Sequence, residues 1–247
     1  MTRVAVLGAR GRMGSTSVRA IDAADGLEVV AQVDLGDDLQ VVADAGAEAA
    51  LVFTTPDVAL EQVLWCVERG VHVVVGTSGF DERRVAEVER AVASHAGVGV
   101  VVVPNFSVGA VLMLRFAAVA APFFESVEVI EMHHPDKVDA PSGTAVRTAE
   151  VVAAAREAAG SAPLPDATAT DPDGARGAKV AGVPVHAVRA RGFVASQEVL
   201  LGGEGEILSL RHDSSTRESF MPGVVAALRA VGTRPGVTVG LDAVLGL

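Results

Sequence analysis

Short, continuous apolar runs alternate with longer amphipathic segments through the first 106 residues. A run without intervening polar positions is typical of a strand buried on both faces of a sheet, as the strands of parallel sheets are. The alternation of such strands with helices predicts a doubly wound α/β fold. The predicted strands are 3–7, 27–33, 50–53, 71–75 and 98–103, and the predicted helices run to about residue 24, from about 57 to 69, and from 81 to 95.

The pattern changes after residue 107. Apolar residues alternate with carboxylates in the short run 127–130, which predicts a strand, and Ser142 is placed to cap a helix over 145–159. Further segments with a period of two predict a mixed or antiparallel sheet, distinct from the first. These segments are 184–189, 196–201 and 206–212; residues 161–182 are predicted to form a long loop, and a last helix is predicted over about 217–231.

A glycine-rich turn follows the first predicted strand. Gly8, Gly11 and Gly14 have the spacing G-x-x-G-x-x-G, and a helix follows them. Strand, turn and helix in this order are typical of the phosphate-binding start of a dinucleotide fold. Asp34 ends the second strand, twenty residues after Gly14, where a carboxylate accepts hydrogen bonds from an adenosine ribose. The alternative is an aspartate that merely forms a turn.

Arg10 and Arg12 flank the same turn. Guanidinium groups at this place pair with the 2′-phosphate of NADPH, whereas Asp34 repels it and favours NADH. The opposing charges predict that both cofactors are used, unless the arginines are only solvated loop charges. Polar residues also follow the third, fourth and fifth strands, at the edge where ligands bind in such sheets. They lie in 54–55, 76–79 and 104–106.

Most of the candidate chemistry lies in the stretch Glu131-Met-His-His-Pro-Asp-Lys-Val-Asp-Ala-Pro-Ser-Gly-Thr-Ala145. The stretch places His133 and His134 at the end of a strand, and Gly143 and Thr144 at the start of a helix, whose amides bind anions. Lys137 adds a positive charge beside them. Proton-transfer groups next to anion donors favour an enzyme that acts on a carboxylate. No H-x-x-H or H-E-x-x-H spacing is present, so a metal site is not expected. The alternative to a functional site is that the two histidines are ordinary surface residues or members of a structural network.

Composition narrows the choice of function. The formal net charge of −11 argues against nucleic acid, which requires a basic face. The lone Cys66 excludes an internal disulfide and fits a reducing, cytoplasmic compartment, and the chain enters its first strand without a signal peptide. The apolar segment 108–124 is interrupted by Arg115 and Pro122, so no membrane span is expected.

The stretch 131–145 closely resembles the signature of the 4-hydroxy-tetrahydrodipicolinate reductase (dihydrodipicolinate reductase) family of bacterial lysine and diaminopimelate synthesis. The block His-His…Lys…Pro-Ser-Gly-Thr is highly specific for this family, whereas the glycine turn is not. Residues 192–204 look like those of actinobacterial members. The likeness covers nearly the whole chain, since it extends to Gly8-Ala-Arg-Gly-Arg-Met-Gly14, Gly76-Thr-Ser-Gly-Phe80, Pro104-Asn-Phe-Ser-Val-Gly109 and Arg211-His-Asp-Ser-Ser-Thr-Arg217.

The resemblance implies reduction of 4-hydroxy-tetrahydrodipicolinate by NADH or NADPH, with loss of water. It implies a Rossmann-type domain of residues 1–106 and 216–247, and an inserted α+β domain of residues 107–215 that binds the dicarboxylate and forms a homotetramer. His133 is then a proton donor or acceptor and Lys137 a proton donor. The implied substrate contacts are His134, Lys137, Ser142, Gly143 and Thr144, and the implied cofactor contacts are Gly8, Ala9, Arg10, Gly11, Arg12, Met13, Asp34, Gly76, Thr77, Ser78, Val103, Pro104, Asn105 and Phe106.

Two positions depart from the family pattern: Ser78 replaces a threonine, and Val52 stands where the family often has aspartate. Two other functions also fit parts of the sequence. A non-catalytic NAD(P)H sensor needs only the dinucleotide-binding half, although it leaves His133 and Lys137 without a role. A semialdehyde dehydrogenase needs a nucleophilic cysteine at the cofactor edge. Cys66 instead falls inside a predicted helix, in a position expected to belong to the core.

Overall fold

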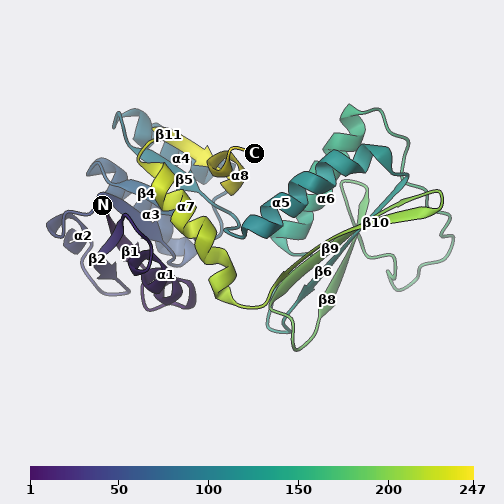
Figure 1. Cartoon of the computed structure of the whole chain (residues 1–247), viewed down its shortest axis with the longest axis horizontal. Coiled ribbons are helices and arrows are strands. Elements are labelled where there is room, and N and C mark those ends of the chain that lie inside the picture. The colour runs from purple at the N-terminus through teal and green to yellow at the C-terminus, as the bar shows by residue number, and fades with distance from the viewer. The chain divides into compact units, whose positions relative to one another are not determined.

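The structure of the chain, a computed structural model, describes all of residues 1–247 (Figure 1). It divides into two compact units. Unit 1 consists of Met1–Val108 and Arg217–Leu247, and unit 2 of Gly109–Thr216. None of the helices combines the length and the apolar character that a membrane crossing requires.

Unit 1 contains a parallel sheet of six strands in the order β11-β5-β4-β3-β1-β2. The order reverses between β1 and β3, and ligands bind at such a switch point in open α/β sheets. The strands are β1 (Thr2–Leu7), β2 (Leu27–Val33), β3 (Ala49–Val52), β4 (His72–Val75), β5 (Gly99–Val102) and β11 (Gly236–Val239); the helices are α1 (Arg12–Asp22), α2 (Gln40–Asp44), α3 (Pro56–Glu68), α4 (Glu82–Ala93), the 3₁₀ turn η2 (Arg217–Phe220), α7 (Met221–Val231) and α8 (Leu241–Leu245).

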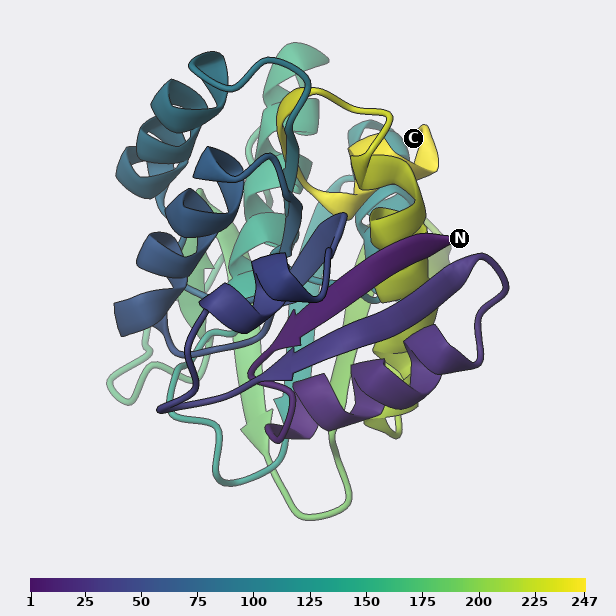
Figure 2. The same ribbon diagram turned by 90° about the vertical axis from the view of Figure 1, so that its left-hand side faces the viewer.

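Helices cover both faces of this sheet, as Figure 2 shows with unit 1 toward the viewer. Helices α1 and α7 contact each other and pack on one face, while α3 and α4 pack together on the other. The central strands are buried on both faces, with Val4, Val6, Leu51 and Val74 at 0% exposure. Continuous apolar runs therefore form these strands because no position in them faces water.

Unit 2 contains a mixed sheet of five strands in the order β10-β9-β6-β8-β7. Only β6 and β8 are parallel, because helix α6 connects one to the other as a crossover; the remaining pairs are antiparallel. Its elements are α5 (Val108–Ala120), the 3₁₀ turn η1 (Ala121–Phe123), β6 (Ser126–His133), α6 (Gly143–Ala158), β7 (Ala178–Val180), β8 (Val183–Arg189), β9 (Ala195–Gly203) and β10 (Glu206–Ser214).

One core holds the helices of unit 2 on its sheet. Met113 and Ala117 of α5, together with Ala149 and Val152 of α6, pack on buried strand residues such as Val129. Helix α6 exposes Arg147, Glu150 and Glu157 on one side. Alanine and valine lie on its buried side, where a small side chain lets the helix approach the strands closely. This packing sets where the first turn of α6 lies relative to the end of β6.

The predicted fold class is confirmed: a Rossmann-type parallel sheet is accompanied by a second, mixed sheet. Several elements were not predicted, among them β11, α2 and β7. The tail after residue 231 contains β11, the sixth strand, and α2 is a short helix in a segment with few apolar residues. The predicted loop 161–182 is too long, because β7 lies inside it and pairs with the edge of β8. Short edge strands bury little apolar surface, so they leave a weak sequence pattern.

Candidate active site

The glycine turn of unit 1 is shaped by close backbone contacts. Gly8 has φ +82°, a conformation that only glycine adopts without strain. A Cβ on Gly8 would lie 2.4 Å from the carbonyl oxygen of Phe53, and one on Gly14 would lie 2.0 Å from the carbonyl oxygen of Gly8. Gly11 caps α1 without any side-chain hydrogen bond. The first amides of α1 therefore have no acceptor supplied by a capping side chain, as a phosphate-binding helix start requires.

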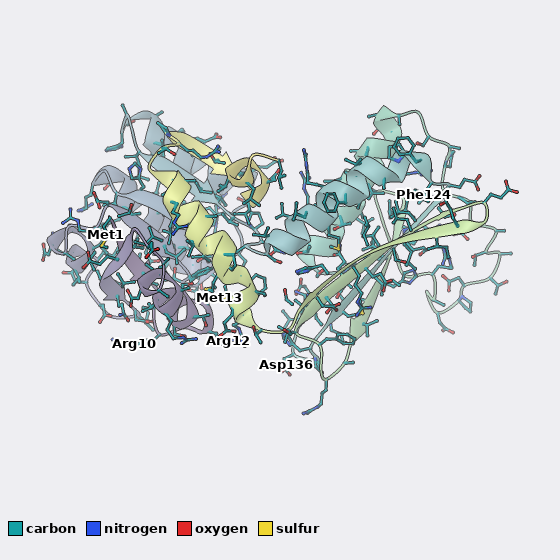
Figure 3. All side chains as sticks on the ribbon, viewed as in Figure 1. Met1, Arg10, Arg12, Met13, Phe124 and Asp136 are labelled. Carbon is teal, nitrogen blue, oxygen red and sulfur yellow. The ribbon has the colours of Figure 1, made fainter.

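Asp34 lies against this turn. Its Oδ2 accepts a hydrogen bond from the backbone N–H of Arg10 at 2.6 Å, which brings the end of β2 to the start of α1. Asp37 adds a second carboxylate: it accepts from the Asp34 N–H at 2.9 Å and lies 3.7 Å from the Arg10 guanidinium. Figure 3 labels Arg10, Arg12 and Met13 at this place. The Asp34 carboxylate thus contacts the backbone of Arg10, whereas the Arg10 guanidinium lies beside Asp37.

The other candidate cofactor residues lie at the carboxyl ends of β4 and β5. Gly76 leaves room for two aromatic rings, Phe53 and Phe106, which meet edge to face with centroids 5.4 Å apart. Thr77 is buried and donates to the carbonyl oxygens of Val52 and Thr54, so its hydroxyl holds the backbone after β3. Of the remaining candidates, Ala9 and Val103 are buried, Met13 and Asn105 are half-buried, and Gly11, Arg12, Ser78 and Pro104 are exposed.

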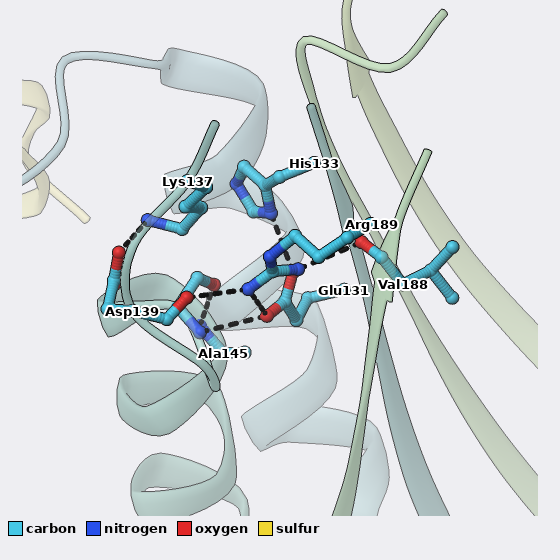
Figure 4. A network of polar contacts seen from close by, with 8 residues as sticks. Glu131, His133, Lys137, Asp139, Ala145, Val188 and Arg189 are labelled. Atoms are coloured by element: carbon cyan, nitrogen blue, oxygen red, sulfur yellow. Dashed lines mark hydrogen bonds and ion pairs between the residues drawn. The ribbon is translucent and has the colours of Figure 1, made fainter. Parts of the chain in front are cut away.

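The candidate proton-transfer residues of unit 2 surround a buried carboxylate, that of Glu131 (Figure 4). Glu131 and His133 are two positions apart on β6, so their side chains lie on the same face of the sheet. His133 Nδ1 lies 2.6 Å from Oε2 of Glu131. Arg189, at the end of β8, donates to both carboxylate oxygens at 2.7 Å. The Glu131 side chain is 0% exposed, so its charge is stabilised by donors of the protein rather than by bulk solvent.

The environment lowers the pKa of both groups. Burial alone raises the pKa of Glu131, but hydrogen bonds from Arg189 and His133 outweigh it and keep this carboxyl below its usual 4.5. For His133, burial lowers the pKa below 6.5, Glu131 opposes this, and the positive charges of Lys137 and Arg189 add to it. At neutral pH the pair is therefore a carboxylate and a largely neutral imidazole.

Lys137 and the start of α6 lie in the segment that follows. The Lys137 ammonium donates to Asp139 at 2.7 Å, and this hydrogen bond lowers the pKa of the Asp139 carboxyl. Ser142 is the N-cap of α6: its hydroxyl accepts from the N–H of Ala145 at 3.2 Å, and its own N–H donates to Glu131 at 3.1 Å. Gly143 is exposed, and nothing lies within 4 Å of where its Cβ would be.

Sequence reasoning placed His133, Lys137 and Ser142 in one stretch, and the structure brings all three close to Glu131. His134 is half-buried, and its carbonyl oxygen accepts from the N–H of Lys137 at 3.2 Å. Arg189 was missed, and Glu131 was given no role. The i, i+2 spacing of Glu131 and His133 was a usable signal for Glu131. No sequence signal pointed to Arg189, because it is 58 positions from Glu131 and only the pairing of β6 with β8 brings it to the carboxylate.

Cys66 has no place among these groups. It lies in α3 at 0% exposure, and burial raises its pKa to about 12. A thiol of this kind is not ionised at neutral pH and cannot act as the nucleophile of a semialdehyde dehydrogenase. No group of three or more His, Cys, Asp or Glu side chains is arranged to hold a metal ion.

Comparison with known proteins gives the same relatives for both units. A family model described as "Dihydrodipicolinate reductase, N-terminus" matches residues 2–106, and one described as "Dihydrodipicolinate reductase, C-terminus" matches residues 109–245. The chain is 56% identical over 245 residues to 4-hydroxy-tetrahydrodipicolinate reductase of Streptomyces coelicolor, covering 99% of this chain and 98% of that protein. It is 52% identical to the protein of the same name from Mycobacterium marinum, covering 99% of both.

A solved structure is similar over the whole length as well. It is described as dipicolinate-bound dihydrodipicolinate reductase from Paenisporosarcina sp. TG-14, with 35% identity, a TM-score of 0.86, and coverage of 98% of this chain and 99% of that one. A myo-inositol 2-dehydrogenase from Lactobacillus plantarum, at 13% identity and a TM-score of 0.59, shares the fold alone.

Proposed function

The chain belongs to the dihydrodipicolinate reductase family, and from this we infer that it reduces 4-hydroxy-tetrahydrodipicolinate to tetrahydrodipicolinate, with loss of water, in the synthesis of diaminopimelate and lysine. The observation that carries the proposal is the arrangement in unit 2: His133 and Lys137 lie in the segment that opens the anion-binding start of α6. The reaction needs these two kinds of group together, because its substrate is a cyclic dicarboxylate and its product gains a proton.

The substrate carboxylates are assigned to the N-terminus of α6 and to Lys137. The amides of Gly143 and Thr144 point out of the helix start, where the helix dipole favours an anion. Lys137 supplies a full positive charge, and His134 completes the set. Dipicolinate, with which the Paenisporosarcina protein is described, is likewise a ring carrying two carboxylates. A site of this kind fits both ends of such a ring better than it fits a single acid.

A nicotinamide cofactor is assigned to unit 1. The close approach at Gly8 and Gly14, the N-cap of α1 without a capping side chain, and Asp34 beside the turn all fit a dinucleotide. The dihydronicotinamide ring supplies the hydride. Phe106 and Gly76 line the carboxyl ends of β5 and β4, while Asp34 is assigned to the adenosine ribose. Because Arg10 and Asp34 act in opposite directions on a 2′-phosphate, we propose that both NADH and NADPH are used.

The protein's contribution to the chemical step is a proton. Loss of water from the substrate leaves a conjugated ring, and hydride addition to it leaves negative charge that a proton must quench. The Lys137 ammonium is assigned as the donor of this proton, and its positive charge also favours the transition state. His133 uses Nε2, since Nδ1 is engaged by Glu131. It donates from Nε2 when the ring is protonated, and as a neutral ring it accepts a proton at Nε2 from water.

The same inference covers assembly and location. Residues 107–215 are proposed to bind substrate and to form a homotetramer, and residues 1–106 with 216–247 to bind the cofactor. Exposed apolar side chains on the mixed sheet, Ile207 at 73% and Val188 at 38% exposure, support an interface there. Light scattering on the purified protein tests it: a monomer at working concentration contradicts the tetramer. A biosynthetic enzyme of this kind is expected in the cytoplasm.

The test of the activity is oxidation of NADH or NADPH in the presence of freshly made 4-hydroxy-tetrahydrodipicolinate, followed by absorbance. We expect turnover with the wild-type chain and loss of turnover in a His133→Ala, Lys137→Ala double variant. Binding of NADH without turnover by the wild type would instead support a cofactor sensor.

A further inference from the structure

We propose that Glu131 is a positioning residue of this reaction: it accepts a hydrogen bond from Nδ1–H of His133, leaves Nε2 as the nitrogen that exchanges protons with the substrate, and with Arg189 holds the segment that carries Lys137. The proposal rests on the proposed function, since it assigns how the proton-transfer groups of that same site are held in place.

The carboxylate of Glu131 has all of its acceptor positions occupied. Oε1 accepts from Arg189 Nη2 at 2.7 Å and from the N–H of Ser142 at 3.1 Å. Oε2 accepts from Arg189 Nη1 at 2.7 Å and from Nδ1 of His133 at 2.6 Å. Each oxygen thus has two donors, and the side chain is 0% exposed. A carboxylate bound in this way has neither the freedom nor the solvent access to contact a substrate, so its effect on the reaction is exerted through its donors.

The first of these donors is the ring of His133. A neutral imidazole carries one proton, and an ionised carboxylate at 2.6 Å from Nδ1 requires that proton to lie on Nδ1. The lone pair is then on Nε2. When the ring takes up a second proton, this proton goes to Nε2, and the adjacent carboxylate stabilises the resulting imidazolium. Glu131 therefore determines both which nitrogen is used and how stable the acid form is.

The second consequence concerns Lys137. Arg189 donates through Nη2 to Glu131 and also to the carbonyl oxygen of Asp139, each at 2.7 Å. The carboxylate of the same Asp139 accepts a hydrogen bond from the Lys137 ammonium at 2.7 Å. Glu131 also holds the N–H of Ser142, immediately before the first turn of α6. The Glu131–Arg189 ion pair thus contacts the segment from Lys137 to Ser142 at both its middle and its end, and so sets where the ammonium and the helix amides lie.

The same strand provides a matched control. Glu128 also lies on β6 and also accepts from a histidine and an arginine: His186 Nε2 at 2.6 Å and Arg176 Nη2 at 2.5 Å. It is three positions from Glu131, so it points to the opposite face of the sheet, and its side chain is 27% exposed. None of its partners belongs to the proposed site. A Glu128→Gln substitution therefore removes the same kind of charge from the same strand without touching His133.

The first experiment needs no variant at Glu131. Long-range ¹H–¹⁵N spectra of the wild-type protein above the His133 pKa report which ring nitrogen carries the proton, and the His133 signals are assigned by their loss in His133→Asn. We expect the Nδ1–H form. A ring found with its proton on Nε2 would overturn the proposal, whatever the catalytic activity of the protein.

The second experiment compares Glu131→Gln with Glu128→Gln. Three charged groups face His133: Glu131 on its own strand, Lys137 in the following segment, and Arg189 on β8. Only Glu131 raises the pKa of His133, so its loss leaves burial and the two positive charges, which all lower it. We expect a kcat about 10²-fold lower in Glu131→Gln. Activity should be lost on the alkaline side at a lower pH in Glu131→Gln than in the wild type. Glu128→Gln should keep the wild-type pH profile.

The outcomes separate a positioning role from a structural one. If Glu131 only stabilised the fold, the Gln variant would lose active protein or raise KM with an unchanged pH profile, and that result overturns the proposal. If Glu131→Gln does not fold, Arg189→Lys keeps the carboxylate and the charge. That variant should retain the Nδ1–H form of His133 but raise KM, because the contact with Asp139 is lost. Failure of wild-type turnover contradicts the proposed function and leaves the spectroscopic result to be judged separately.

Discussion

The Nδ1 atom of His133 lies 2.6 Å from Oε2 of Glu131, and the side chains belong to one face of one strand. Each of them changes the protonation of the other: the imidazole helps to lower the pKa of the carboxyl, and the carboxylate opposes the effect of burial on the imidazole. The protonation of this pair therefore couples the stability of unit 2 to pH.

The stabilising effect of the Glu131 charge should be lost on acidification. The folded-state pKa of Glu131 is below 4.5, so its charge stabilises the fold above that pH and ceases to do so as the pH falls through the folded-state value. Thermal unfolding of the wild type and of Glu131→Gln should therefore differ most near neutral pH, and the difference in Tm should shrink below about pH 4.5. A difference that grows on acidification would show that the pKa of Glu131 is raised.

Asp34 should discriminate between the cofactors. Only NADH has the free 2′-hydroxyl from which this carboxylate accepts, while NADPH places a phosphate there. Asp34→Ala should therefore weaken NADH binding more than NADPH binding, by about 1–2 kcal/mol in free energy. Fluorescence titration with each cofactor measures this, and Asp25→Ala, which removes an exposed carboxylate just before β2, serves as control. Equal losses for the two cofactors would contradict the ribose assignment.

His133 and Lys137 should differ in their kinetic signatures. His133→Ala removes a proton-transfer group alone, so kcat should fall about 10²-fold with little change in KM. Lys137→Ala removes a proton donor and a positive charge beside the helix start, so kcat should fall and KM rise together. NADH affinity, measured by fluorescence without substrate, should stay near the wild-type value in both. Loss of NADH binding in His133→Ala, with turnover retained at saturation, would place His133 in the cofactor site.

Thr144 should contribute to substrate binding through its hydroxyl. Thr144→Val keeps the shape of the side chain and the amides of α6, so it should raise KM by the equivalent of about 1–2 kcal/mol while kcat stays close to wild type. Thr170→Val, at an exposed position of the long loop, should leave both parameters unchanged. A fall in kcat with no change in KM would argue against a substrate-holding role for Thr144.

Arg156 should matter for stability rather than chemistry. It is 7% exposed in α6 and donates to the backbone carbonyls of Ala121, Phe124 and Ala162, which joins α6 to η1 and to the following loop. Arg156→Met leaves these carbonyls without their donor, including that of Ala121 in a buried hydrogen bond, and should lower the free energy of unfolding by about 3 kcal/mol. Arg147→Met, an exposed change in the same helix, should cost under about 0.5 kcal/mol. Urea unfolding of unit 2 compares them.

Local patterns in the sequence determined much of this protein. The apolar runs of unit 1 identify buried parallel strands, because a strand covered on both faces has no polar position. Gly8 and Gly14 mark a turn that no larger residue can form. Ser142 predicts the start of α6 from capping chemistry alone, and the motif around His133 and Lys137 identifies the family. Each of these depends on neighbours in the chain.

Tertiary structure decided what depends on distant partners. Arg189 reaches Glu131 only because β8 lies parallel to β6, a pairing that the crossover through α6 produces and that no local pattern encodes. The edge strands β7 and β11 likewise depend on pairing with β8 and β5, since their own residues bury little apolar surface. The sequence therefore singled out His133 and Lys137 as candidates for proton transfer, whereas only the fold could show that a buried carboxylate and a distant arginine lie beside them.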